Sequence, residues 1–209
     1  MSLLTLLTAN AATISALKDT VLAIAGVTTG VVAVVGLTSW RRELHGKTEY
    51  EAARNLIRAA YKLREVFDDA RQPLVTGGEF PAGYVKGKNE DENARAWAHV
   101  FRARWEPIAK VLEDFDTVAL EAEALWATPI RDSAKELRSV VRVLQVAMQA
   151  YIANEQSGGE DFRCDNNFGK QMRSEVFASR DSQDNPLSLR FRAALGSLET
   201  EVRPKLKRR

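Results

Sequence analysis

Cysteine and histidine are scarce in this sequence of 209 residues, which holds one cysteine, Cys164, and two histidines, His45 and His99. A single cysteine cannot form an intramolecular disulfide, and this usage predicts a reducing compartment. Neither histidine has a cysteine or a carboxylate at the spacing that metal ligands adopt, so no metal site is expected.

An excess of one charge sign is also lacking, because 30 basic residues face 28 acidic ones. A dedicated nucleic-acid binder would carry a clearly positive field, and no nucleic-acid partner is therefore indicated. Gly77 and Gly78 are not followed by the lysine and hydroxyl residue of a phosphate-binding loop. We expect no cofactor, and no nucleophile has a base at a recognisable spacing.

What the sequence does contain is a long uncharged run over residues 20–40, bracketed by Lys18-Asp19 and Arg41-Arg42. As a helix, these 21 residues would span about 30 Å, the thickness of the hydrocarbon core of a bilayer. A buried core helix, or a strand over residues 31–35, is the alternative. The run predicts a single transmembrane helix, with the lipid bilayer as its first partner.

The charges that flank this run predict its orientation. Trp40 ends the run at the headgroup level that amphipathic rings prefer, and Arg41, Arg42 and Lys47 follow it, whereas Lys18 alone lies on the other side. By the positive-inside rule, the N-terminus faces out and the C-terminal part is cytoplasmic. A cleaved signal peptide fits poorly because the basic cluster follows the apolar run.

Small residues form a stripe on the predicted membrane helix. Gly26 and Gly30 make a GxxxG pair, and Ala23 and Ala33 continue it at helical spacing. Such residues let two helix backbones approach closely, which favours association. We expect a homo-oligomer; a merely glycine-rich anchor is the alternative. Gly36 lies off this stripe.

Helical periodicity dominates the rest of the chain. Apolar residues recur at intervals of three and four over residues 47–71, 92–126, 128–157 and 185–203, with a loop over 73–90. Pro107 should kink or restart the second segment, Leu189 should be buried in the last, and Pro204 should end it. The polar stretch after Gly158-Gly159 predicts a loop with a short helix over residues 171–178.

These patterns predict an all-α protein: a membrane segment over residues 1–40, then a cytoplasmic bundle of four or five helices over residues 41–209. No strand alternation or repeat appears. The chain ends in a basic tail that is either solvated or docked on lipid headgroups or on an acidic patch of a partner: Lys205, Lys207, Arg208 and Arg209.

One pair of residues suggests an enzyme. Arg95 and His99 lie four apart, on one face of the predicted helix. The pair resembles the Arg-x4–6-His signature of helical HEPN ribonucleases, in which the two side chains stabilise and protonate the phosphate under attack. Here the spacing is one residue short and no polar residue follows Arg95. The resemblance implies a divergent, membrane-tethered ribonuclease.

The membrane-proximal segment carries another resemblance. Residues 36–54, which include Trp40-Arg41-Arg42-Glu43-Leu44 and Gly46-Lys47-Thr48-Glu49-Tyr50, together with residues 61–64, are similar to a group of uncharacterised bacterial single-pass membrane proteins. The likeness covers about residues 20–75 and implies the inner-membrane topology argued above. More loosely, a membrane helix joined to a helical domain resembles accessory proteins of RNA-targeting CRISPR systems and other phage-defence effectors.

Three functions follow, in order of preference. The first is a non-enzymatic, self-associating membrane protein whose cytoplasmic helices bind an unknown protein partner. The second is a defence effector that multimerises and permeabilises the inner membrane, for which Thr20, Thr28 and Thr38 offer a weak polar stripe. The third is the ribonuclease that would use Arg95 and His99.

Overall fold

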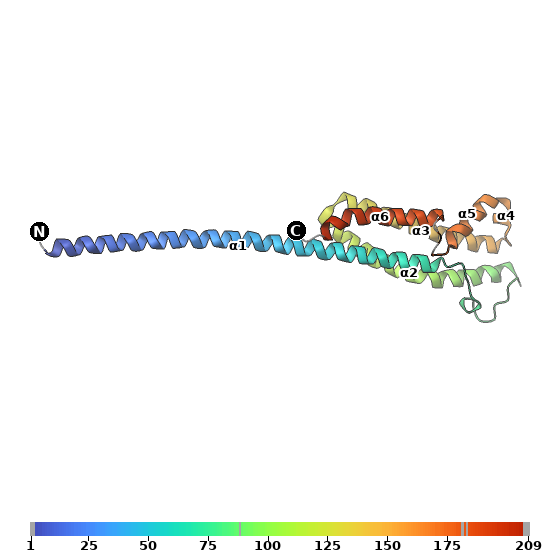
Figure 1. The fold of residues 1–209 in the computed structure, drawn as a ribbon. Helices are drawn as coiled ribbons and strands as arrows, with labels where there is room; N and C mark the ends of the chain where they lie inside the picture. The colour runs from blue at the N-terminus through green and yellow to red at the C-terminus, as the bar shows by residue number, and fades with distance from the viewer. Residues whose placement is uncertain (1–2, 88, 181, 183, 207–209) are drawn as a thin grey trace. The chain divides into compact units, whose positions relative to one another are not determined.

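The computed structural model describes residues 3–87, 89–180, 182 and 184–206, with backbone only for residues 3–17 and 19. These residues form helices and no strands, as predicted (Figure 1): α1 (Leu3–Ala70), the 3-10 turn η1 (Gly77–Glu79), α2 (Glu90–Trp126), α3 (Thr128–Gln156), α4 (Glu160–Cys164), α5 (Asn166–Val176) and α6 (Pro186–Leu206). Within the basic tail, Lys205 is described, and Lys207, Arg208 and Arg209 lie outside the described residues.

The chain divides into two compact units, Met1–Thr48 and Glu49–Arg209. Helix α1 contributes to both, because it continues through Gly46 without interruption. The first unit is helical in its described residues and contains the whole uncharged run. The second unit begins eight residues beyond the predicted boundary at residue 40 and holds the hydrophobic core.

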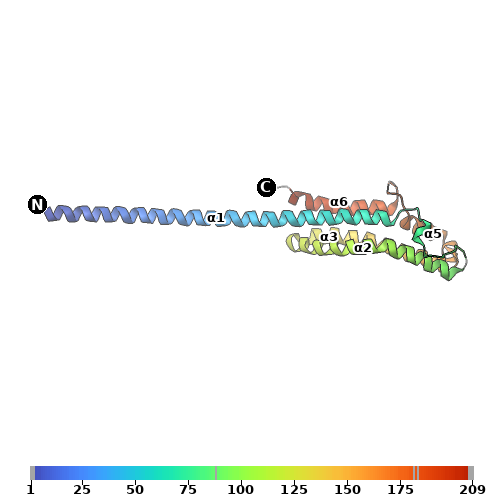
Figure 2. The same ribbon diagram turned by 90° about the horizontal axis from the view of Figure 1, so that it is seen from below.

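Four long helical segments of the second unit lie side by side: the C-terminal part of α1, α2, α3 and α6 (Figure 2). Each segment buries its apolar stripe, as a helix facing a core must. The fully buried side chains include Leu56, Leu63 and Phe67 of α1, Ile108 and Phe115 of α2, Leu137 and Leu144 of α3, and Phe191 and Leu198 of α6. Phe67 and Phe191 stack with ring centroids 4.5 Å apart, which joins α1 to α6.

Capping residues explain where these helices begin. The Asn89 side chain accepts a hydrogen bond from the Glu92 N–H at the start of α2, and Asn185 does the same for Ser188 at the start of α6. Pro186 is the first residue of α6, as predicted. Helix α3 begins at Thr128, the first residue of the predicted segment, and Ala127, at φ 57°, occupies the cap position before it.

Two predictions on α6 are wrong, and one of the two effects predicted for Pro107 does not occur. Pro107 does not restart α2, which continues from Glu90 to Trp126. Pro204 does not end α6, because a proline in the last turn removes only one hydrogen bond and Leu206 still packs on the core. Leu189 is 50% exposed, and the neighbouring Leu187 and Phe191 are buried in its place.

The polar stretch after α3 is more ordered than predicted. It folds into α4 and α5, whereas the sequence suggested a loop with one short helix over residues 171–178. The Asp165 side chain caps α5 by accepting a hydrogen bond from the Phe168 N–H, and Phe162 of α4 is buried. Local capping and one buried aromatic ring thus stabilise a segment whose composition is mostly polar.

Candidate functional site

The uncharged run is helical and exposed along its whole length. Its large apolar side chains are uncovered by the rest of the chain, with Val27 68% and Trp40 59% exposed. The run belongs to the one helix, among the described residues, that is long and apolar enough to span a membrane, and its apolar part is exposed. The alternative of a strand over residues 31–35 is wrong, because these residues are helical.

The predicted packing stripe lies open on this helix. Ala23, Gly26, Gly30 and Ala33 are all exposed, and a Cβ added to either glycine would meet no atom within 4 Å. Another helix could therefore approach the backbone closely at this face.

The threonines of the same helix are satisfied locally. The Thr28 hydroxyl donates to the Ile24 carbonyl at 2.8 Å, and Thr38 donates to Val35 at 2.9 Å. Hydroxyl groups bonded to their own helix can enter an apolar medium at lower cost. The same bonds leave these donors unavailable to line a polar channel.

The basic flank is exposed as well. Arg41, Arg42 and Lys47 follow Trp40 in the first unit, and all three are exposed. Side chains of this kind reach toward phosphate groups, and each contributes roughly 1 kcal/mol beside an anionic leaflet.

Arg95 and His99 are both exposed on the first turns of α2. Arg95 borders a shallow polar depression whose other lining residues are Asn89, Glu90, Asp91 and Glu92. Three carboxylates beside the arginine would repel a phosphate backbone. The described residues hold no group of three histidine, cysteine or acidic side chains that could bind a metal ion.

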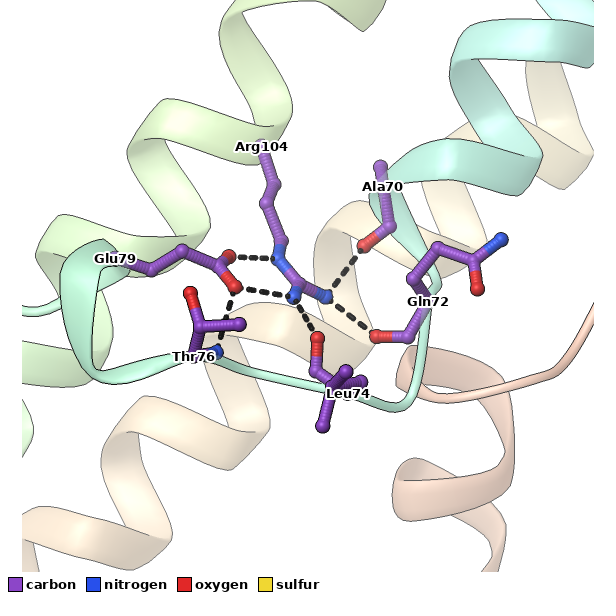
Figure 3. Close-up of polar contacts among 6 residues, drawn as sticks. All are labelled: Ala70, Gln72, Leu74, Thr76, Glu79 and Arg104. Carbon is purple, nitrogen blue, oxygen red and sulfur yellow. Dashed lines mark hydrogen bonds and ion pairs between the residues drawn. The ribbon is translucent and has the colours of Figure 1, made fainter.

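Two arginines that sequence reasoning missed, the partly buried Arg104 and the buried Arg71, organise the bundle. Arg104 of α2 uses all five guanidinium N–H donors at the end of α1 (Figure 3): two bonds reach the Glu79 carboxylate, the shorter 2.7 Å, and three reach the carbonyls of Ala70, Gln72 and Leu74. This satisfies carbonyls that a helix end leaves open. The hydrogen bond from Arg104 also lowers the pKa of Glu79.

Arg71 makes the second junction, between α1, α5 and α6. Its guanidinium donates to the carbonyls of Glu175 and Ser174 and to the side chains of Asn185 and Ser188, at 2.7 to 3.1 Å. Burial lowers the pKa of Arg71 to about 10, so the group remains charged at neutral pH. Both arginines hold neighbouring segments together through these hydrogen bonds.

Comparison with protein-family models, with curated proteins and with solved structures finds no match for this chain. Function must therefore be argued from the exposed apolar helix, its basic flank and the surface of the helical unit.

Proposed function

We propose that this chain is a single-pass, self-associating membrane protein of the bacterial inner membrane, whose cytoplasmic helical unit binds a protein partner without catalysis. One observation carries the proposal: residues 20–40 form a helix with no charge and no burial. Leaving so many large apolar side chains in water is unfavourable at about 25 cal/mol per Å², and insertion into lipid removes that cost.

The sidedness follows from the flanks. Arg41, Arg42 and Lys47 all follow the run, and basic residues close to a membrane helix stay on the cytoplasmic side. The helical unit that begins at Glu49 would then face the cytoplasm, where its free Cys164 stays reduced.

A topology experiment tests this arrangement. A phosphatase that is active only outside the cytoplasm should be inactive when fused after Arg209, and a fluorescent protein fused there should fold. Replacing Arg41, Arg42 and Lys47 by glutamine, with lysines added before residue 18, should shift copies to the opposite orientation. An active phosphatase on the unaltered chain would refute the proposed sidedness.

The alternatives make different demands. A permeabilising effector needs a polar lining, whereas the hydroxyl donors of Thr28 and Thr38 bond within their own helix. Expression of such an effector would depolarise the membrane, and we expect no depolarisation.

A ribonuclease would cleave RNA, and its activity would be lost in the variant His99→Ala. We expect that neither the unaltered chain nor this variant cleaves RNA, because carboxylates line the depression beside Arg95.

A further inference from the structure

A basic groove runs along the exposed face of α1 within the helical unit. Its cations are Arg54, Arg58 and Lys62, and its apolar parts are Tyr50, Tyr61 and, from the end of α6, Leu206. Glu65 also lines it, so the cations outnumber the carboxylates. None of the ion pairs found among the described residues uses Arg54, Arg58 or Lys62.

An acidic strip runs along the exposed face of α2. Between residues 111 and 130 there are five carboxylates and no basic residue. The exposed members of one helical face are Glu113, Asp114, Thr117, Leu120, Glu121, Ala124 and Leu125. Leu120 is 62% exposed and Leu125 is 41% exposed, so the strip combines negative charge with uncovered apolar surface. The groove combines positive charge with apolar surface in the same way.

The two surfaces lie at the same level of the bundle. Helices α1 and α2 run in opposite directions, and the Arg104 bond to the Ala70 carbonyl fixes their register. Arg54 lies as many residues before Ala70 as Leu120 lies after Arg104, so these two positions are at the same height along the antiparallel helices. The same count relates Tyr61 of α1 to Glu113 of α2. At the end of the bundle, Leu206 borders the groove beside Tyr50, and its neighbour Lys205 lies over the Trp126 ring of α2.

We propose that the basic groove of one copy binds the acidic strip of a second copy. This inference rests on the proposed function, because a single membrane span in a common orientation holds all copies at one depth. Copies in one membrane and one orientation can then bring the groove of one helical unit to the strip of the next. Opposite charge and uncovered apolar side chains make the pair complementary, and charge complementarity sets the register of such contacts. Different patches meet in this contact, so it can repeat around a ring or along an array in the membrane plane.

Cross-linking between two differently tagged full-length chains in membranes tests the contact. Both chains carry Cys164→Ser to remove the exposed native thiol. One carries Asn55→Cys on the exposed face of α1, and the other carries Thr117→Cys on the acidic strip. A short thiol cross-linker should give a product that carries both tags. The yield of this product should fall in about 0.5 M salt, because the screening length is then only about 4 Å and attraction between exposed charges is weak.

Charge reversal identifies the groups responsible. The yield should fall about tenfold or more when the groove chain carries glutamate at Arg54, Arg58 and Lys62, because like charges then face each other. It should recover when the other chain carries lysine at Glu113, Asp114 and Glu121. The matched control makes the same change in net charge on exposed residues outside both surfaces and should leave the yield unchanged: Lys86→Glu, Arg95→Glu and Lys170→Glu.

Absence of the product that joins the two tags, or loss without recovery, overturns the docking proposal and leaves the groove to another partner. An equal loss of cross-linking yield in the matched control variant also overturns the proposal, because the loss would then follow from the change in net charge and not from the groove. The proposed function fails separately: it fails if the unaltered chain does not stay in the membrane, which is measured on the same samples before cross-linking.

Discussion

At the scale of single residues, two arginines explain how the helical unit is joined. Arg71 directly follows α1, Arg104 of α2 contacts the same end of that helix, and together they bind the loop, α5 and α6. Their roles could not be predicted from sequence, because every one of these partners lies 25 or more residues away in the chain. A charged residue on a helical pattern normally indicates a solvated face, and here that interpretation is wrong.

Glu79 offers a residue-scale prediction with a definite pH dependence. The hydrogen bond from Arg104 holds the pKa of Glu79 below its ordinary value of 4.5. Because the pKa of Glu79 is lower in the folded than in the unfolded state, the ionised carboxylate stabilises the folded protein. This contribution to the free energy of unfolding is complete above pH 4.5 and is lost as the pH falls through the pKa of the folded state. Glu79→Gln should therefore lower the free energy of unfolding by about 1 kcal/mol at neutral pH.

Thermal unfolding of the full chain in detergent, followed by circular dichroism, measures this difference. The gap between unaltered protein and variant should narrow as pH falls below 4.5. The control variant Glu106→Gln changes an exposed carboxylate two residues from Arg104 and should show no such gap. A gap for Glu79→Gln that stays constant through acid would contradict the ion pair.

At the scale of elements, the strongest sequence signals were local ones. Asn185-Pro186 predicted the start of α6 correctly because a side-chain cap and a first-turn proline act within a few residues. In the α4–α5 segment the short helix predicted over residues 171–178 overlaps α5, but α4 was missed because the contacts of its buried Phe162 come from other helices. Leu189 was misplaced for the same reason: the position of Phe67 on α1 decides which face of α6 turns inward.

Two glycines give opposite predictions for helix packing. A Cβ at Gly169 of α5 would lie 2.7 Å from the Cβ of Phe162 and 3.1 Å from its carbonyl oxygen, so Gly169→Ala should cost about 1 to 3 kcal/mol by forcing α4 and α5 apart. A Cβ at Gly196 of α6 would meet nothing within 4 Å, so Gly196→Ala should stabilise by about 0.5 to 1 kcal/mol. Unfolding midpoints that move in the same direction would contradict this assignment.

The open stripe on the apolar helix gives the second element-scale prediction. Gly26→Ile or Gly30→Ile should lower oligomer size in detergent, because a branched side chain prevents close approach of two backbones. The matched control Gly36→Ile makes the same replacement off the stripe and should leave the size unchanged. Light scattering of the purified protein measures both, and equal sizes for all three variants would reject packing through this face.

At the scale of the whole molecule, composition already separates the two parts. An uncharged run of membrane length and an amphipathic remainder predict a membrane segment and a helical domain, and the all-helical fold agrees. The surface that meets a partner could not be predicted, because the basic groove and the acidic strip acquire a common level only through the packing of α1 against α2. Their complementarity emerges from the tertiary structure.

Alkaline extraction of cell membranes tests the central claim most directly, since it strips peripheral proteins and leaves spanning ones in the bilayer. The full-length chain should remain in the membrane pellet and enter solution only with detergent, because the proposed function places the exposed apolar side chains of residues 20–40 in lipid. Recovery in the alkaline supernatant as a compact species without detergent would contradict the membrane span, and with it the orientation and the side-by-side assembly.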